Sequence, residues 1–479
     1  MPLRGGTLIT LPFSLIKKRW YDINPRPRRE LMTSINPALR LCRFAPFLIM
    51  VACTLAAGQQ ESSLYSFRFN GTDGFDPIVG LVSDKAGNLY GTTPYGGTYN
   101  DGAIFELSPP SSNGGLWSET ILYNFTGGVD GGNPSAPLIL DKSGNLYSTT
   151  AGGVISAQCP TGCGSVFELS PPAIPGGSWS YSFVYQFSPS SPSKPFGGVV
   201  RDQAGHLYGA TLDTPTGAGT AFELIPPSAP GGVWTEKVLY SFSGGSNDSA
   251  TQTTLAIGKN HALYGTTQGG GASNNGTVFE LAPPSNPGAP WTKTTLYSFL
   301  GGNDGSGLDA GVALDPQGNV YGTTAVGGPM GVGTVFELIP PAVQGGKWTE
   351  VILYAFQAAV GAVPYDTPII DSAGNLYGTT SQGGPHNVGM VFKLAPPLKK
   401  GGAWTFTTLH DFTGGAKSFN EGAFPWGGSR QAMAEVSTAP RGREAPVTAR
   451  MPSTTAAARY SGLPRKAGGK PILTPLTFP

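Results

Sequence analysis

Residues 77–125, PIVGLVSDKAGNLYGTTPYGGTYNDGAIFELSPPSSNGGLWSETILYNF, decide the fold because they form one period of a repeat. The strings LYGTT and FEL, and a tryptophan followed by LYxF, are landmarks that return five more times, unchanged or as close variants. The LYGTT tyrosines are Tyr90, Tyr147, Tyr208, Tyr264, Tyr321 and Tyr377, and the tryptophans are Trp117, Trp179, Trp234, Trp291, Trp348 and Trp404. The tyrosines lie 56 to 61 residues apart. A period of this length indicates a repeat architecture.

Each period predicts four short strands, which in the first repeat are residues 77–84, 88–93, 102–108 and 117–125. Asp, Gly and Asn between the first two strands tolerate the backbone angles of a tight hairpin. Two prolines end the third strand because proline cannot donate to a ladder. In the fourth strand every second residue is large, so period two predicts one buried face made of Trp117, Glu119, Ile121, Tyr123 and Phe125.

A single sheet of this size leaves edges uncovered that would recruit other chains. Packing successive sheets face to face around an axis avoids this, so we expect an all-β protein, a β-propeller with four-stranded blades and six repeats of about 57 residues. A linear β-solenoid is the competing fold. Residues 64–67, LYSF, copy the end of a fourth strand and could complete a seventh blade whose other strands come from the far end of the chain.

Composition agrees with a turn-rich β protein. Gly and Pro together make up about 24% of the 479 residues, which excludes a largely helical chain because both residues disfavour helices. Aromatic residues make up 10% and charged residues 12%, the opposite of the balance in disordered chains. Residues 61–412 carry a net charge of −12. Such an acidic body argues against nucleic acid as a partner, because phosphate binding needs Lys and Arg.

Residues 1–58 are interpreted as an N-terminal extension and a signal peptide that begins near Met32. Two arginines precede an apolar run from Phe44 to about Ala57, which is the pattern of an export leader. The run of about 14 residues is too short to span a bilayer. A buried helix and a lipoprotein acylated at Cys53 are the alternatives. We expect an exported monomer without a transmembrane span, located outside the cell, on its surface or in the periplasm.

Cys159 and Cys163 remain once the leader is removed. They lie four positions apart in a loop where the second repeat is five residues longer than most others, so we expect a local disulfide that closes an insertion. A zinc site would need two further ligands, and none is visible nearby.

The pattern D-x-x-G-N-L-Y-G-T-T, then G-T-V-F-E-L, Pro-Pro and W-T-x-x-x-L-Y-x-F, resembles the GloVer tandem repeat of bacterial choice-of-anchor proteins. The resemblance covers residues 64–412 and implies an exported bacterial repeat protein, with no catalytic residues attached. We assign residues 59–412 to the repeat domain. Residues 413–479 form a basic tail without a recognisable anchor. From about Ser429 the tail is interpreted as an out-of-frame seventh repeat, because codons shifted within residues 436–441 can encode LYGTT.

Carboxylates recur at fixed positions of the repeat. They are Glu106, Glu168, Glu223, Glu280 and Glu337 in third strands, and Asp84, Asp141, Asp202, Asp315 and Asp371 at first hairpins. We expect the Asp side chains to cap their own turns and the Glu side chains to pair across strands. A ring of acids that binds cations or polar glycans is the alternative, as is Ca²⁺ bound by loops such as 127–131 and 301–305. His206, His261, His386 and His410 are interpreted as repeat variants.

No nucleophile, base and orienting acid can be assembled, so we assign no catalytic residue, metal ligand or cofactor. The main functional hypothesis is a non-enzymatic binding or surface-interaction module that takes a protein or polysaccharide ligand at one end of the ring. The alternative is a propeller enzyme that acts on a glycan or lactone at the axial channel. A non-repeating cluster of His, Asp or Glu near the innermost strands would favour the enzyme.

Overall fold

The computed structural model describes residues 63–414 with short gaps, which are 69, 113, 154–158, 160–161, 189–192, 213–218, 230, 245–250, 252, 287, 344 and 400. The predicted leader and nearly all of the predicted tail lie outside the described residues. Among the residues that the structure describes, no helix is long and apolar enough to cross a membrane.

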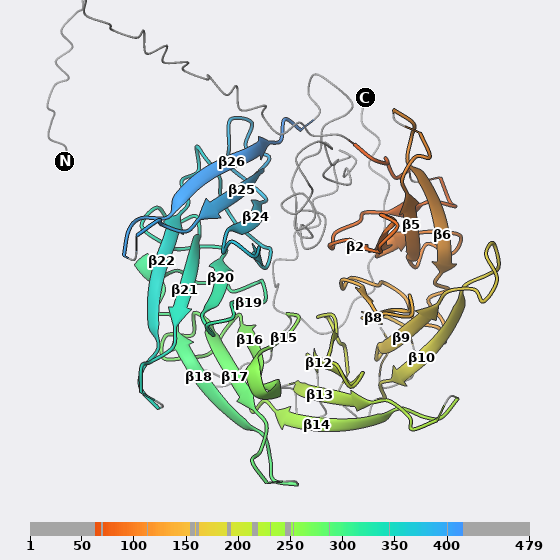
Figure 1. Ribbon diagram of the computed structural model, residues 1–479, viewed down its shortest axis with the longest axis horizontal. Coiled ribbons are helices and arrows are strands. Elements are labelled where there is room, and N and C mark those ends of the chain that lie inside the picture. The colour runs from red at the N-terminus through yellow and green to blue at the C-terminus, as the bar shows by residue number, and fades with distance from the viewer. Residues whose placement is uncertain are drawn as a thin grey trace, which may run out of the picture. The chain divides into compact units, whose positions relative to one another are not determined.

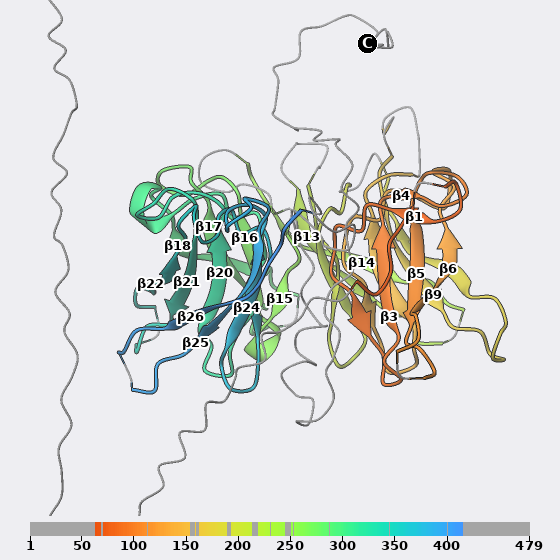
Figure 2. The same cartoon turned by 90° about the horizontal axis from the view of Figure 1, so that it is seen from above.

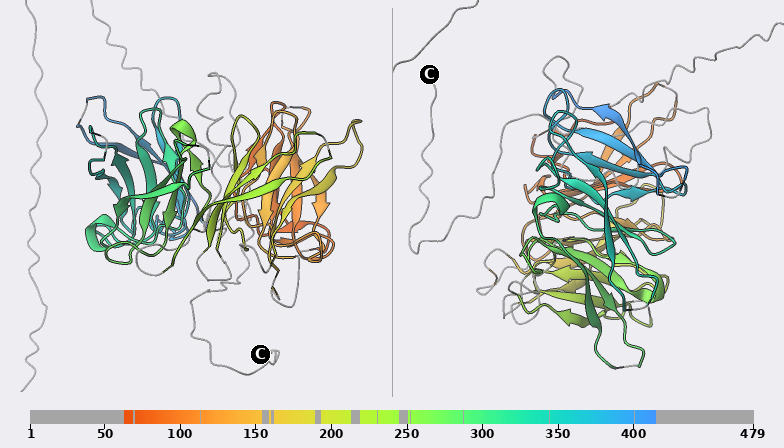
Figure 3. Two further views of the ribbon diagram at one scale, coloured as in Figure 1. Left: turned by 90° about the horizontal axis from the view of Figure 1, so that it is seen from below. Right: turned by 90° about the vertical axis from the view of Figure 1, so that its left-hand side faces the viewer.

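Each repeat folds into one four-stranded antiparallel sheet, and the six sheets follow one another around a common axis (Figure 1). The predicted β-propeller is therefore confirmed, with six blades among the described residues. Within a blade the strands follow chain order from the centre of the ring to its rim. Seen from the side, hairpins and loops gather at the two ends of the ring (Figures 2 and 3).

Blade one holds β2 (Val82–Ser83), β3 (Leu89–Thr93), β5 (Ala103–Ser108) and β6 (Ser118–Asn124). Blade two holds β7 (Ile139–Leu140), β8 (Leu146–Thr150), β9 (Ser165–Ser170) and β10 (Ser180–Gln186). Blade three holds β11 (Val200–Arg201), β12 (Leu207–Thr211), β13 (Thr220–Ile225) and β14 (Thr235–Ser241). Blade four holds β15 (Ala256–Ile257), β16 (Leu263–Thr267), β17 (Thr277–Ala282) and β18 (Thr292–Ser298).

Blade five holds β19 (Ala313–Leu314), β20 (Val320–Thr324), β21 (Thr334–Ile339) and β22 (Thr349–Ala355). Blade six holds β23 (Ile369–Ile370), β24 (Leu376–Thr380), β25 (Met390–Ala395) and β26 (Thr405–Asp411). Two short strands, β1 (Gly74–Phe75) and β4 (Tyr95–Gly96), pair beside blade one. Two 3₁₀ turns, η1 (Lys259–His261) and η2 (Gly302–Asp304), lie in connections.

The innermost strand is shorter than the sequence predicts. In blade one the expected strand covers residues 77–84, but β2 has two residues, which pair with Tyr90 and Leu89. The chain bends at Val79, so the residues before the bend leave the ladder. The other three strands of the repeat agree with their expected ranges to within a residue or two.

The prediction that the fourth strand has one large buried face is wrong. In β6, Ile121 pairs with Phe105 but Tyr123 pairs with Ile104, so Leu122 is an extra residue and forms a β-bulge. A bulge shifts the alternation, which places the Trp117 end on one face of the sheet and the Tyr123 end on the other. The register shifts at the equivalent place in all six blades. The fourth strands of blades two to five therefore contact both neighbouring blades.

Aromatic contacts between consecutive blades repeat with little variation. In blades one to five the phenylalanine at the end of the fourth strand packs edge-to-face on the FEL phenylalanine of the next blade, with ring centroids 5.1 to 5.6 Å apart. The tryptophan of each of blades two to six packs against the cluster that holds the LYGTT tyrosine of the preceding blade, as Trp179 does with Tyr90. Buried aromatic area of this kind stabilises the stacking of the blades.

Candidate functional site

The hydroxyl group of the LYGTT tyrosine in every blade donates a hydrogen bond to an acidic side chain of the same blade. In blade five the Tyr321 hydroxyl lies 3.1 Å from Asp315 Oδ2 and 2.9 Å from Glu337 Oε1. The ladder register explains the contact, because Tyr321 pairs directly with Glu337 across the sheet. The corresponding bonds in the other blades start from Tyr90, Tyr147, Tyr208, Tyr264 and Tyr377.

The hairpin aspartates also organise their own turns. Asp371 accepts backbone N–H groups of Ala373 and Asn375 at 2.9 and 2.8 Å and the Asn375 side-chain amide at 2.7 Å. Burial on its own would raise the pKa of Asp371, but these hydrogen bonds outweigh it and lower that pKa. Burial, and after it the charge and hydrogen bond of Asp371, together raise the pKa of Tyr377 to about 12. These hydrogen bonds fit the turn-capping role expected from the sequence.

Blade three departs from this pattern at His206, which stands where blades one, two, five and six have Asn. Its backbone N–H donates to Asp202 Oδ1 at 2.9 Å, as the Asn does elsewhere, but its ring turns to the next strand. His206 Nδ1 lies 2.7 Å from Glu223 Oε1, which also accepts the Tyr208 hydroxyl at 3.1 Å. Lys237 Nζ lies 3.8 Å from the other Glu223 oxygen. Histidine, tyrosine and two carboxylates thus form one connected group.

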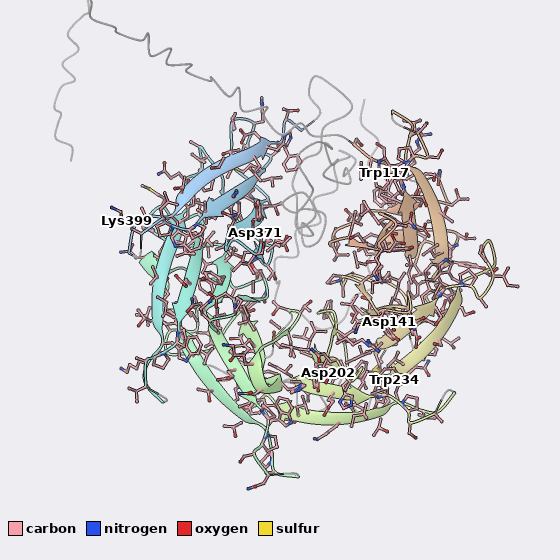
Figure 4. The ribbon with its side chains drawn as sticks, in the orientation of Figure 1. Trp117, Asp141, Asp202, Trp234, Asp371 and Lys399 are labelled. Atoms are coloured by element: carbon pink, nitrogen blue, oxygen red, sulfur yellow. A yellow bond between two sulfur atoms is a disulfide. The ribbon has the colours of Figure 1, made fainter. Side chains whose placement is uncertain are left out.

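Blade three also contacts the blades on either side through an ion pair and a histidine–carboxylate contact. Arg201 of β11 reaches back to blade two, where its Nη2 atom lies 3.9 Å from Asp141 Oδ2. His261 of blade four reaches back to blade three, where its Nδ1 atom lies 3.8 Å from Asp202 Oδ2. Asp141 and Asp202 lie toward the centre of the ring, whereas Lys399 lies at its rim (Figure 4).

Blade four lacks the turn-capping carboxylate because Gly258 occupies its position. A Cβ atom at residue 258 would lie 2.4 Å from the Tyr264 ring, so the tyrosine ring fills the space. His261 stands at the position of the turn glycine and has a φ of 59°, in the left-handed region. This hairpin therefore has a different shape, and its His261 contacts Asp202 of blade three.

The carboxylates of this region are buried and the cations are exposed. The side chains of Asp141, Asp202 and Glu223 are 5 to 10% exposed. The basic side chains that contact them, Arg201, Lys237 and His261, are 33 to 64% exposed. Lys85, Lys142 and Lys259 are also exposed, at the tips of the equivalent hairpins in blades one, two and four. We name Lys85, Lys142, Arg201 and Lys259 the hairpin cation arc.

The two loop carboxylates considered for Ca²⁺ are engaged by protein groups. Asp130 accepts the Tyr123 hydroxyl at 3.0 Å and the Thr126 backbone N–H at 2.9 Å. Asp304 accepts the Tyr297 hydroxyl at 3.3 Å and the Leu300 backbone N–H at 2.9 Å. Within the described ranges, no group of three or more His, Cys, Asp or Glu side chains is placed to hold a metal ion.

Cys159 and Cys163 form a disulfide with Cα atoms 5.4 Å apart. Both cysteines are buried in the cluster between blades two and three, against residues such as Val199 and Phe222. The bridge therefore belongs to a blade junction as well as to its loop.

The sequence identified the two histidine positions and the recurring acids, but it missed their grouping. Asp141 and Arg201, and likewise Asp202 and His261, lie about one repeat apart at neighbouring hairpin positions. Aligning consecutive repeats position by position is the pattern that could have found these pairs. The contact between His206 and Glu223 needs the strand register, which the sequence does not specify.

The sequence profile of the Gloeobacter/Verrucomicrobia repeat matches residues 51–242 and 216–432. No curated protein sequence matches the chain. Solved structures with a similar fold include an ulvan lyase of polysaccharide lyase family 25, at 10% identity and a TM-score of 0.42, over 73% of this chain and 86% of that one. A glucose dehydrogenase is similar at 14% identity and a TM-score of 0.39, over 71% and 99% of the two chains.

A luciferin-regenerating enzyme is similar at 13% identity and a TM-score of 0.37, over 70% of this chain and 97% of the other. Likenesses at this level carry no argument about activity, since one fold serves many functions. The profile match, by contrast, covers well over half of the sequence. The chain belongs to the Gloeobacter/Verrucomicrobia repeat family.

Proposed function

We propose that the protein is an exported, non-enzymatic binding propeller whose hairpin cation arc holds an acidic polysaccharide. The arc itself is the observation that carries the proposal. It places exposed cations on equivalent hairpins of four consecutive blades, at one end of the ring, while the neighbouring carboxylates are buried. A chain of carboxylate or sulfate groups can contact several hairpins at once, and such multivalent contact raises the affinity of individually weak ion pairs.

The hydrogen bonds of the recurring acids support a binding function rather than catalysis. In the blades that keep the repeat pattern, the hairpin Asp caps its turn and accepts the tyrosine hydroxyl, as Asp315 does for Tyr321. Such acids are held in place by two or more donors. The predicted leader at residues 32–58 would bring the protein to polysaccharides outside the cell.

Binding to polygalacturonate tests the proposal, with neutral dextran as the matched uncharged polymer. We expect saturable binding of polygalacturonate at low salt, weakening as salt screens the charges, and no binding of dextran. The Arg201→Gln/Lys259→Gln double variant should bind about tenfold more weakly or worse. Lys399→Gln, a loss of charge at the rim, should bind as the unmodified protein does. Equal binding by the double variant would overturn the assignment of the arc.

A second candidate is an enzyme that acts on a glycan or lactone. It is favoured by one observation, that His206, which departs from the repeat pattern, contacts Glu223 in a group that also holds Tyr208 and Asp202. His206 is 29% exposed and lies 2.7 Å from a buried carboxylate, an arrangement that can move a proton. The two candidate functions predict different results for the His206→Asn variant in assays of binding and of product release.

A further inference from the structure

The connection between the third and fourth strands exposes a large apolar side chain in five of the six blades. Among the described residues, six large apolar side chains are at least 75% exposed, and five of them lie in these connections. The five are Leu116, Ile174, Val233, Val343 and Leu398. Single exposed apolar residues are common on protein surfaces, but these five recur at one place of the repeat. We name the connections the outer hairpins and the five residues the apolar tips.

The outer hairpins lie at the same end of the ring as the hairpin cation arc. Because neighbouring strands of a blade are antiparallel, its first and third connections lie at one end and its second connection at the other. The two kinds of hairpin also touch, since a Cβ atom at Gly144 would lie 3.4 Å from the Pro171 ring and one at Gly374 would lie 3.7 Å from the Pro396 ring. The connections from β17 to β18 and from β21 to β22 reach outward beyond the rim (Figure 1). The apolar tips therefore lie outside the arc at one end of the ring.

The exposed charges at this end are basic. Lys347 and Lys399 are exposed in two of the outer hairpins, in addition to the four cations of the arc. Every described Asp and Glu side chain is buried or partly buried. Although residues 61–412 carry a net charge of −12, this end of the ring therefore combines exposed cations with exposed apolar side chains.

We propose that this end of the ring docks on the surface of an anionic lipid bilayer. The apolar tips would enter the interfacial region of the bilayer, and the arc, with Lys347 and Lys399, would contact the anionic headgroups. Apolar burial and attraction to anionic lipid add together in binding of this kind.

The spacing of the tips and the sign of the charge select this partner. The tips lie on separate hairpins of blades one, two, three, five and six, so a partner must offer apolar surface at several separated places at once. A bilayer offers it at every place. Its anionic headgroups also complement the exposed cations. The inference goes beyond the proposed function, which assigns a polysaccharide to the arc and leaves the apolar tips without a role.

The test places an environment-sensitive fluorescent amino acid at position 233 of the full-length chain and adds vesicles of equal parts phosphatidylcholine and phosphatidylglycerol. We expect its emission to brighten and shift to the blue as the tip enters the bilayer. The matched control carries the same fluorophore at position 129, because Val129 is 80% exposed in a loop at the opposite end of the ring, and its emission should not change. The fluorophore reports its own surroundings, so lipid binding by another part of the chain does not produce this difference.

Substitution of other tips tests whether they act together. With the fluorophore at position 233, Leu116→Ser/Leu398→Ser should need at least about tenfold more lipid for the half-maximal spectral change. Val129→Ser/Leu300→Ser, which removes two exposed apolar side chains at the opposite end, should need the same amount as the unmodified chain. All four side chains are at least 63% exposed, so their loss should leave folding unchanged. The tip variant keeps the arc and should still bind polygalacturonate, which separates this test from that of the proposed function.

Three outcomes overturn the proposal. The first is no spectral change at position 233, or an equal change at position 129. The second is an equal lipid requirement for the tip variant and the unmodified chain. The third is a dimer in sedimentation equilibrium that Leu116→Ser/Leu398→Ser abolishes and that anionic vesicles do not dissociate, because a second copy would then cover the tips.

Discussion

In five blades the residue that closes the first hairpin, Asn or His, determines which acidic side chain is contacted there. Asn88, Asn145, Asn319 and Asn375 donate their side-chain amides to the hairpin aspartate at 2.7 to 3.2 Å. In blade three His206 keeps the backbone bond to Asp202 but sends its ring to Glu223, 17 residues further along the chain. The sequence placed His206 in the turn correctly. It could not supply the partner, because that depends on which residue of β13 lies opposite Tyr208.

The variant His206→Asn restores the residue found in four other blades. We expect its melting temperature to stay within about 3 °C of the unmodified protein, because the asparagine amide can bond Asp202 as it does elsewhere. A binding propeller should still bind polygalacturonate and should show no turnover in either form. If the protein is instead an enzyme, the unmodified chain releases product from a glycan or lactone and the variant does not. Assays of binding and of product release on both proteins decide between the two functions.

At the scale of elements, the bulged fourth strand explains how blades two to five contact a neighbour on each side. The residue two positions after the tryptophan meets the Tyr of the preceding fourth strand, and its chemistry varies. Tyr181 stacks on Tyr123 with ring centroids 4.4 Å apart, and Phe406 stacks on Tyr354 with ring centroids 4.0 Å apart. Glu236 accepts the Tyr185 hydroxyl at 3.2 Å. Periodicity predicted the strand but not the bulge, which has no residue pattern of its own and arises from pairing with the third strand.

At two junctions the residue two positions after the tryptophan is a glutamate that lies near an aspartate. Both glutamates should make the stability of the protein depend on pH. Burial, with Asp304 beside it, raises the pKa of Glu350 from its ordinary 4.5 to about 7. The folded protein thus holds this proton more tightly than the unfolded chain does. Its contribution to stability is fully present below about pH 4.5 and is lost as the pH rises through about 7.

Glu350→Gln cannot ionise, so it should match the unmodified protein at pH 4 and melt about 3 °C or more above it at pH 8. Glu119, which faces Asp73, has its pKa raised by burial to about 8, so Glu119→Gln should show the same behaviour with a window extending to that pH. Scanning calorimetry between pH 4 and 8 measures both effects. Curves that run parallel for variant and unmodified protein would show that these junctions do not titrate.

For the whole molecule, the repeat alone predicted the number and kind of blades because each of blades one to five buries its landmarks on the next blade. Phe125 on Phe167 and Phe356 on Phe392 are the same contact, so one period describes the core of the described ring. The His206 group and its contact with His261 follow the opposite logic, since they exist where blades three and four leave the repeat at His206, Gly258 and His261. A consensus pattern describes what recurs, and it therefore predicts the scaffold better than the site.

Stability in such an array is a sum over blades and their junctions, so position in the array matters. Phe299 joins blades four and five, is fully buried and lies 5.1 Å from Phe336. Phe299→Ala should cost about 3 to 5 kcal/mol at a junction with blades on both sides, so amide exchange should rise in both blades. Phe67→Ala removes the contact between residues 64–67 and Phe105, and these residues pack on blade one. Its faster exchange should be confined to β2, β3 and β5, and hydrogen-exchange mass spectrometry of both variants would contradict this account if Phe67→Ala loosened blades four and five as well.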